Sequence, residues 1–194
     1  MKNDSFLLTF SRQPYTNLIM NFFLQNKELS FRDEIIWYDP QPIWISNQLP
    51  LRNHENILFF RKGKKKINPF IGEKNNLKTQ YKGKSKIGKW TGGNRIYKPN
   101  DKKMITSILK FPRNLKSNLG RLEKPEGLIK ILIECFTLKL DLVLDPFLGS
   151  GITAITCEKL NRRWIGIEIN EKYCKLSKQR ILKTLEEKDS LFKE

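Results

Sequence analysis

The sequence predicts an α/β protein with a doubly wound, Rossmann-like sheet. Five short apolar runs bounded by turn residues are the expected strands, at 5–10, 34–38, 56–61, 141–145 and 164–168. Segments with apolar residues at helical spacing separate several of these runs. Strands that alternate with helices are typical of a sheet with helices packed on both faces.

The N-terminal third contains three of these strands. "SFLLTF" is the first, and Pro14 suits the start of a helix in which Leu18, Ile19, Phe22 and Phe23 recur at helical spacing. "EIIWY" is followed by the stiff turn "DPQP", and "NILFFRK" follows "RNHE". All three strands are nearly continuous apolar runs, as expected for strands covered on both faces.

The middle of the chain has a different composition. From Arg61 to Lys103 there are fifteen Lys or Arg residues against two acids, with many Gly and Asn and only scattered aromatic residues. Such a segment cannot bury a core of its own, so we expect a long excursion from the fold.

Regular structure is expected again after the basic segment. Pro125 suits the first helical position and Glu126 the positive helix end, and apolar residues then recur on one broad face. The strand 141–145, a glycine turn and a helix to about residue 160 come next. A strand in "RWIGIEI" and a last helix capped by Asn170 complete the order.

Composition limits the class of protein. The 194 residues suit one medium domain, and a formal charge of +17 attracts polyanions. No apolar run could span a membrane and no signal peptide is evident, so we expect a cytoplasmic protein. Zinc-ligand spacing is absent, so reduced, packed thiols are expected at three positions: Cys135, Cys157 and Cys174.

The segment "LVLDPFLGSGITA" carries the clearest chemical signal. Its glycines let the backbone approach a ligand, and the positive end of the following helix attracts a carboxylate or phosphate. Glu168 ends the next strand, 23 residues after Asp145, where it can accept hydrogen bonds from ribose hydroxyls. Strand, glycine turn, helix, strand and acid form the general adenosine-binding βαβ unit.

Two cofactor classes compete for this turn. Residues 149–154 satisfy G-x-G-x-x-A, the dinucleotide fingerprint of oxidoreductases. A dinucleotide domain needs further βα units after the turn, whereas here one strand and one helix follow. The other strands must therefore precede the turn, which is a circular permutation of the usual order.

Residues 142–181 closely resemble the C-terminal end of the permuted, beta-class DNA amino-methyltransferases. These enzymes transfer a methyl group from S-adenosylmethionine to adenine N6 or cytosine N4. Their signature D-P-F-x-G-S-G-[TS]-T is matched by seven residues, with Ile152 in place of the usual small hydroxyl residue: Asp145, Pro146, Phe147, Gly149, Ser150, Gly151 and Thr153.

The resemblance implies a Rossmann-like, circularly permuted methyltransferase fold that binds S-adenosylmethionine. Asp145 and the glycine turn would hold the methionine moiety and Glu168 the ribose. The family's H-x-T-Q-K-P segment, which lines the cofactor pocket, is reduced here to Lys124 and Pro125 in "GRLEKP". An ordinary helix start is an equal alternative for those two residues.

The family order also implies a division of the chain. Residues 1–60 would hold the C-terminal strands of the catalytic half, 61–108 a basic target-recognition insert and 109–194 the S-adenosylmethionine-binding half. The expected partner is double-stranded DNA, because cations in the insert would contact phosphates. A solvated charged loop is the alternative for these candidates: Lys64, Lys65, Lys66, Lys82, Lys84, Lys86, Trp90 and Arg95.

The family's catalytic motif, [DNS]-P-P-[YFW], is not found. The imitations "RQPY", "YDPQPIW" and "INPF" are unconvincing as catalytic sites, and His54, Trp37 and Trp44 are expected to be structural. We therefore expect an N-terminally incomplete fold in which the edge of the strand ending at Asp145 is unpaired. A second polypeptide would then supply the catalytic motif.

The expected function is that of a site-specific DNA methyltransferase, with adenine N6 favoured, of the kind found in restriction–modification systems or mobile elements. The chain would be a truncated or split form. The alternatives are a catalytically silent remnant that binds DNA or cofactor and, with less support, a dinucleotide-dependent oxidoreductase.

Overall fold

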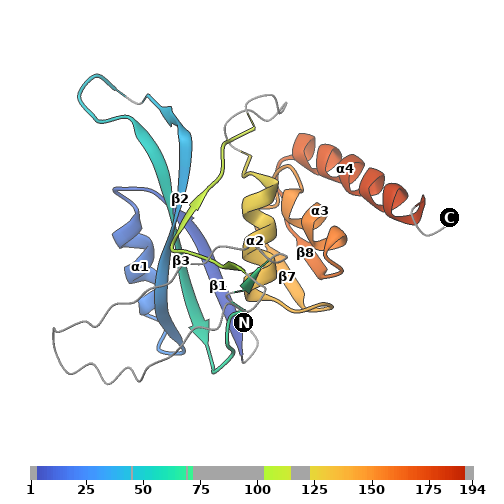
Figure 1. Cartoon of the computed structure of the whole chain (residues 1–194), viewed down its shortest axis with the longest axis horizontal. Coiled ribbons are helices and arrows are strands. Elements are labelled where there is room, and N and C mark those ends of the chain that lie inside the picture. Colours follow the sequence, from blue (N-terminus) through green and yellow to red (C-terminus); the bar gives the residue numbers. More distant parts are fainter. Residues whose placement is uncertain (1–3, 45, 69, 72–102, 115–122, 191–194) are drawn as a thin grey trace.

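The computed structural model describes residues 4–44, 46–68, 70–71, 103–114 and 123–190 (Figure 1). Twelve elements lie in these ranges. They are β1 (Ser5–Ser11), α1 (Thr16–Leu24), β2 (Leu29–Ile43), β3 (Arg52–Lys62), β4 (Phe70–Ile71), β5 (Lys103–Met104), β6 (Ile108–Lys110), α2 (Glu126–Phe136), β7 (Leu142–Asp145), α3 (Ile152–Lys159), β8 (Arg163–Gly166) and α4 (Glu171–Ser190).

Three separate sheets are formed. The largest has the order β1-β3-β2-β6, in which β3 is antiparallel to both neighbours and β6 is parallel to β2. Leu8 lies opposite Phe59, and Trp37 lies opposite Leu109. The second sheet is the parallel pair β7 and β8, and the third is the short antiparallel pair β4 and β5.

Helices cover both faces of the four-stranded sheet. The side chains of β3 alternate between the faces, so Phe60 meets Phe23 of α1 with ring centroids 5.3 Å apart. Phe59 meets Phe136 of α2 on the other face, at 5.1 Å. The predicted α/β layering is thus present, and Ile57 to Phe60 are buried as their continuous apolar sequence indicates.

Helix α2 joins the two main sheets. One side of it, which includes Leu128 and Leu132, packs in a core with β2 and β3, while Ile129 and Ile133 pack with α3. Val143 of β7 packs against this second group. Figure 1 shows α2 between the four-stranded sheet and the β7–β8 pair. Within the part of the chain that the structure describes, β1 pairs only with β3, and β7 only with β8.

One face of the β7–β8 pair is apolar and open. Leu142, Leu144, Ile165 and Ile167 alternate with inward-facing residues, and their side chains are between 43% and 59% exposed. Parallel sheets are normally buried on both faces, so this open face departs from the usual α/β arrangement.

The five predicted strands are present, although β2 and β3 extend well beyond 34–38 and 56–61. Strands β4, β5 and β6 were not predicted, because two or three residues are too short to show periodicity. Asn170 caps α4 as predicted, since its Oδ1 accepts a hydrogen bond of 2.9 Å from the Lys172 N–H.

The expectations for packed residues need two corrections. Trp37 is fully buried, but Trp44 is 63% exposed in the segment between β2 and β3. Cys135 and Cys157 are buried, and burial raises the pKa of both thiols to about 12. Cys174 is exposed in the first turn of α4, where its Sγ donates to the Glu168 carbonyl at 3.3 Å. Across the described ranges, no helix is both long and apolar enough to cross a membrane.

Candidate functional site

The predicted glycine turn lies at the carboxyl end of β7, where ligands bind in α/β sheets. Gly149 and Gly151 have φ values of +53° and +84°, in the left-handed region that favours glycine. A Cβ atom on Gly151 would lie 2.9 Å from Ser177 Cβ of α4. The turn is therefore tight both in its backbone and against its neighbour.

Asp145 organises the start of the turn. Its Oδ1 accepts a hydrogen bond of 3.0 Å from the Phe147 N–H, and its Oδ2 accepts one of 2.6 Å from Thr153 Oγ1. Pro146 and Phe147 are exposed, Phe147 to 86%. The Asp145 carboxylate and the Thr153 hydroxyl thus bind each other across the turn, which gives them a local structural role.

Glu168 lies beside the turn as predicted, although β8 ends at Gly166 and the predicted strand 164–168 included Glu168. Its two carboxylate oxygens accept hydrogen bonds of 2.7 Å from the N–H groups of Asn170 and Gly149. These two hydrogen bonds lower the pKa of the Glu168 carboxyl below its ordinary value, because they favour the carboxylate form. Each oxygen has a further lone pair that can accept a hydroxyl hydrogen bond.

Ser150 is buried between the two glycines. Its hydroxyl donates to Glu123 Oε1 at 2.9 Å, and Arg180 of α4 donates to the Ser150 carbonyl at 3.0 Å. Glu123 is the residue before Lys124 and Pro125. Neither Glu123 nor Arg180 was predicted from the sequence. The only signal for Glu123 is that this chain has a carboxylate where the family segment has Gln.

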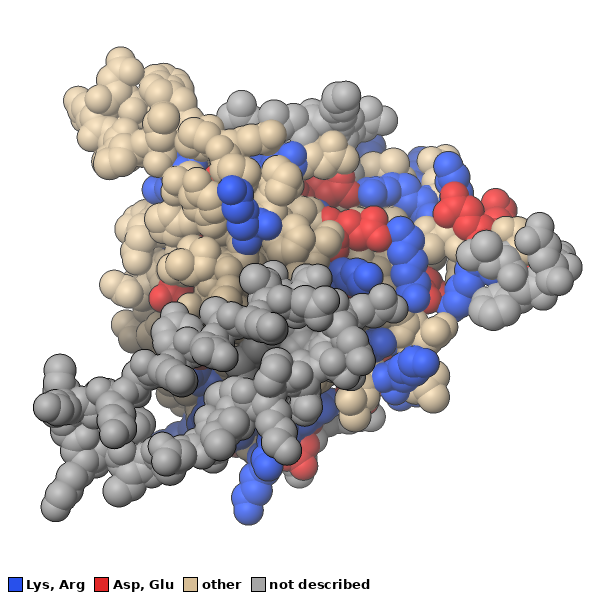
Figure 2. Space-filling model, viewed as in Figure 1, with Lys and Arg blue, Asp and Glu red and all other residues tan. Residues whose placement is uncertain are grey.

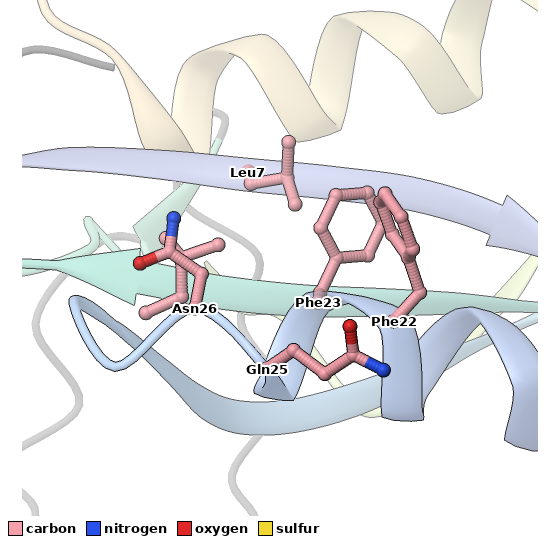
Figure 3. Close-up of a pocket in the computed structure, with 6 residues that line it drawn as sticks. Leu7, Phe22, Phe23, Gln25 and Asn26 are labelled. Carbon is pink, nitrogen blue, oxygen red and sulfur yellow. The ribbon is translucent and has the colours of Figure 1, made fainter.

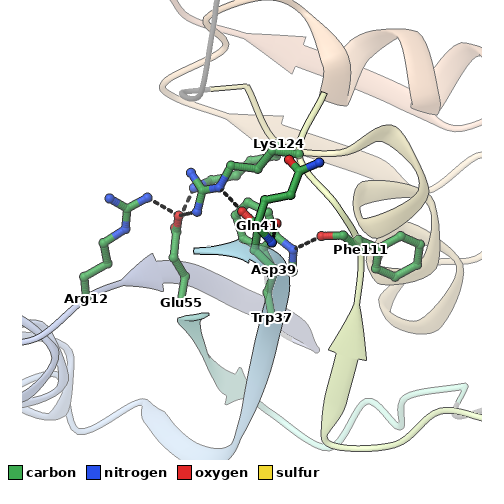
Figure 4. A network of polar contacts seen from close by, with 8 residues as sticks. Arg12, Trp37, Asp39, Gln41, Glu55, Phe111 and Lys124 are labelled. Carbon is green, nitrogen blue, oxygen red and sulfur yellow. Dashed lines mark hydrogen bonds and ion pairs between the residues drawn. The ribbon is translucent and has the colours of Figure 1, made fainter. Parts of the chain in front are cut away.

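Lys124 points toward the four-stranded sheet, where it takes part in a buried ionic cluster (Figure 4). Its Nζ donates to Glu55 Oε2 at 2.6 Å and lies 4.7 Å and 5.0 Å from the rings of Phe10 and Trp37. Pro125 directly precedes α2, and its carbonyl accepts the Leu128 and Ile129 N–H groups. These contacts make Lys124 and Pro125 a link between α2 and the sheet.

Glu55 is the centre of this ionic cluster. Its carboxylate accepts hydrogen bonds from Arg12, from Arg113 Nη2 at 2.8 Å and from Lys124. Arg113 also donates from Nε to Asp39 Oδ2 at 2.6 Å, and its guanidinium lies 4.5 Å from the Trp37 ring. The described cluster thus contains three cations and two carboxylates.

The candidate DNA-binding residues are only partly covered by the structure. Lys64 and Lys66 are exposed, whereas Lys65 Nζ donates to Asp141 Oδ2 at 2.7 Å, at the end of β7 opposite to the turn. Figure 2 shows that the visible charged side chains gather over α2, α3 and α4, with both signs intermixed. The other candidates lie outside the described residues: Lys82, Lys84, Lys86, Trp90 and Arg95.

The three segments that imitate the catalytic motif make structural contacts through their described residues. Arg12 of "RQPY" binds Glu55, Asp39 of "YDPQP" binds Arg113, and the Asn68 N–H of "INPF" donates to the Cys135 carbonyl at 2.7 Å. His54 is exposed, and its Nδ1 lies 3.4 Å from Asn53 Oδ1. In the ranges that can be described, no group of three His, Cys, Asp or Glu residues could hold a metal ion.

A hollow lies on the face of the four-stranded sheet that α1 covers. Figure 3 shows Phe22 and Phe23 of α1 beside Leu7 of β1, with Gln25 and Asn26 at the margin. The hollow has an apolar wall and no ionised side chain among its lining residues. It is therefore an imperfectly filled core boundary and brings together none of the predicted site residues.

The chain matches the DNA methylase family over residues 1–179. It is 29% identical over 181 residues to Type II methyltransferase M.HpaI of Haemophilus parainfluenzae, which covers 93% of this chain and 54% of that relative. It is 31% identical over 167 residues to M.SmaI of Serratia marcescens, with 84% and 50% covered. The chain therefore spans about half the length of these relatives.

Solved structures support the same fold. The crystal structure of the M1.HpyAVI–SAM complex has a TM-score of 0.66 at 25% identity, over 93% of this chain and 76% of that chain. PvuII DNA methyltransferase, titled cytosine-N4-specific, has a TM-score of 0.63 at 14% identity, over 90% and 63%. The Rossmann-like methyltransferase fold predicted from the sequence is confirmed.

An α/β fold with helices on both faces of its main sheet and a nucleotide-type glycine turn defines the general class of this protein. The family match covers nearly the whole chain, so the protein belongs to the DNA methylase family. The resemblance to DNA amino-methyltransferases inferred from the sequence is thereby confirmed.

Substitutions of the two glycines test the geometry of the turn. Gly149→Ala should lower the free energy of unfolding by about 1 kcal/mol, because only the left-handed backbone is strained. Gly151→Ala should lower it by about 3 kcal/mol, because the new methyl group also meets Ser177. Urea denaturation of both variants measures the difference, and equal losses would contradict the close contact with α4.

The ionic cluster predicts a dependence of stability on pH. Burial alone would raise the pKa of Glu55, but Arg12 and Lys124 together lower it below its ordinary value of 4.5. A carboxyl with a lowered pKa in the folded state stabilises the fold above its ordinary pKa. That stabilisation is lost as the pH falls below 4.5 and through the lowered value.

Glu55→Gln should therefore lower the free energy of unfolding at pH 7 by about 3 kcal/mol, because it removes the buried carboxylate that Arg12, Arg113 and Lys124 share. The variant should also lose the part of the acid dependence that Glu55 causes. Glu171→Gln removes a carboxylate from an exposed ion pair with Lys175 and is the matched control. Parallel pH profiles for wild type and Glu55→Gln would refute the role given to this cluster.

Proposed function

We propose that this chain is the S-adenosylmethionine-binding part of a DNA amino-methyltransferase. The observation that carries the proposal is the glycine turn at the end of β7, with the Glu168 carboxylate fixed next to it by Gly149 and Asn170. The relatives are named as Type II methyltransferases, and a similar solved structure is titled as a complex with SAM.

The residues present fit this cofactor. Glu168 presents carboxylate lone pairs to the two ribose hydroxyls, and the backbone of the turn with the positive end of α3 suits a carboxylate. The left-handed glycines leave no side chain to obstruct that approach. When bound, S-adenosylmethionine supplies an electrophilic methyl group, and the target amine attacks it directly.

The proposed substrate is double-stranded DNA. The formal charge of +17 and the basic segment after β3 favour binding to phosphates, and this binding should weaken steeply with salt. Adenine N6 is our first candidate for the methylated amine, with cytosine N4 as the alternative. Digestion of the methylated DNA to nucleosides distinguishes the two products.

We further propose that a second polypeptide segment completes the active site. In the described part of the chain, β1 is an edge strand beside β3 alone, and β7 has β8 as its only neighbour. Among the same residues, α2 packs between the two sheets and no ladder joins them. A strand carrying [DNS]-P-P-[YFW] at its carboxyl end would pair with these edges and place the motif beside the glycine turn.

The open face of the β7–β8 pair supports the same proposal. Exposed apolar surface of this kind is normally covered by another element, and a helix following the supplied strand would cover it. The chain's span of about half its relatives' length is in agreement with a missing segment. The competing hypothesis is a catalytically silent remnant that binds cofactor or DNA.

Cofactor binding and methyl transfer can be tested separately. Chain 1–194 should bind S-adenosylmethionine without methylating mixed-sequence DNA, because its sequence has no [DNS]-P-P-[YFW] motif to accept the amine's hydrogen bonds. Glu168→Ala should weaken binding at least about tenfold, because two ribose hydroxyls lose a charged acceptor. Calorimetry and transfer of labelled methyl groups to DNA are the measurements.

The matched control is Glu171→Ala, which removes an exposed carboxylate from the first turn of α4. A segment with [DNS]-P-P-[YFW], taken from immediately upstream or from a neighbouring reading frame, should restore methyl transfer when it is added. Transfer by the chain alone would refute the need for that segment. Absence of cofactor binding both with and without it would refute the methyltransferase proposal.

A further inference from the structure

Ser150 is the only residue with a side chain between the two left-handed glycines of the turn. Because glycine is conformationally permissive, Gly149 and Gly151 restrict the φ and ψ angles on either side of Ser150 less than other residues would. A side-chain anchor at Ser150 can therefore decide the orientation of the turn. The structure shows such an anchor, and its two partners, Glu123 and Arg180, are not among the signature residues.

Three hydrogen bonds form a closed ring around Ser150. Its hydroxyl donates to Glu123 Oε1 at 2.9 Å, and Arg180 Nη1 donates both to that same oxygen at 2.6 Å and to the Ser150 carbonyl at 3.0 Å. The ring joins three segments far apart in the sequence: the residue before Lys124, the glycine turn and α4.

The burial and charge of the ring make it specific. The Glu123 side chain is 6% exposed, so its carboxylate requires a cation, which Arg180 supplies. Arg180 is one helical turn after Ser177, the residue that touches Gly151. One face of α4 thus holds the turn through a steric contact and an ionic contact.

We propose that Glu123 and Arg180 are positioning residues for the glycine turn, which they hold in the orientation that accepts the amino-acid end of S-adenosylmethionine. This inference rests on the proposed function. The Ser150 carbonyl, fixed by Arg180, sets the plane of the peptide that ends at Gly151, whose N–H donates to the Leu148 carbonyl at 3.0 Å. Glu168 lies outside the ring, and its Oε1 is held separately by the Asn170 N–H at 2.7 Å, so the ribose end of the ligand has an anchor that does not depend on the ring.

A positioning role for Glu123 explains why this chain has Glu before Lys124 where the family segment has Gln. A Gln carbonyl could accept the Ser150 hydrogen bond, but a neutral amide could not form the ion pair that Glu123 makes with the partly exposed Arg180. Glu123 and Arg180 therefore form a matched pair, and their effects should not be additive.

The test compares two ligands that share adenosine but differ at the amino-acid end. In the full chain, Glu123→Gln and Arg180→Gln should each weaken S-adenosylhomocysteine about tenfold, the loss expected for one charge-assisted hydrogen bond. Binding of 5′-methylthioadenosine, which has no amino-acid end, should be unchanged. The double variant should lose no more than either single variant, because the pair acts as a unit.

Glu126→Gln is the matched control, because its carboxylate forms an exposed pair with Lys159 only three residues from Glu123. This variant should bind both ligands as the wild type does. Equal weakening of both ligands by Glu123→Gln, or no weakening of either, would overturn the positioning role. Failure of the wild type to bind either ligand would instead count against the proposed function.

Amide hydrogen exchange of the free chain tests the ring without any ligand. Exchange at Gly151 should become about tenfold faster in Glu123→Gln than in wild type, whereas Leu160, whose N–H donates to the Thr156 carbonyl at the far end of α3, should be unchanged. Unchanged exchange at Gly151 would overturn the inference regardless of what the chain binds.

Discussion

The packing of α2 between two sheets is the constraint on which the rest of this structure depends. Most α/β proteins carry their layers on one continuous sheet, but here β1 and β7 share no ladder among the described residues. Leu128 and Leu132 fill one core and Ile129 and Ile133 the other, so a single helix is buried on two sides. Each such side chain contributes about 1.5–3 kcal/mol when buried, which makes this helix the main apolar connection between the halves.

The ionic cluster adds direction to this apolar connection. Removing Glu55 and Asp39 from water is costly, and the arrangement is tolerated because Arg113 and Lys124 bind the two carboxylates directly. Lys124 lies two residues before α2 and binds Glu55 of β3, and its neighbour Glu123 binds Ser150 of the glycine turn. Two adjacent residues with opposite charges thus bind elements of the two different sheets.

Much of the fold could be predicted from the sequence because its signals are local. The continuous apolar run at Ile57–Phe60, the cap at Asn170 and the Gly149-Ser150-Gly151 turn each depend on neighbouring residues. The partners of Glu55 and Glu123 could not be predicted, because they come from segments 27 to 69 residues away. Strand β6 escaped prediction for a related reason, since its three residues become a strand only through pairing with β2.

The contacts of the candidate cofactor site are almost all contained within the C-terminal part of the chain. Asp145 binds Thr153, Glu168 binds Gly149, and Ser150 binds Glu123, without help from β1, β2 or β3. The exposed edge and open face of β7–β8 therefore affect what can be placed beside this site more than they affect the site itself. Cofactor binding and methyl transfer should consequently be separable properties, the first residing in this chain and the second requiring an element at the gap between β1 and β7.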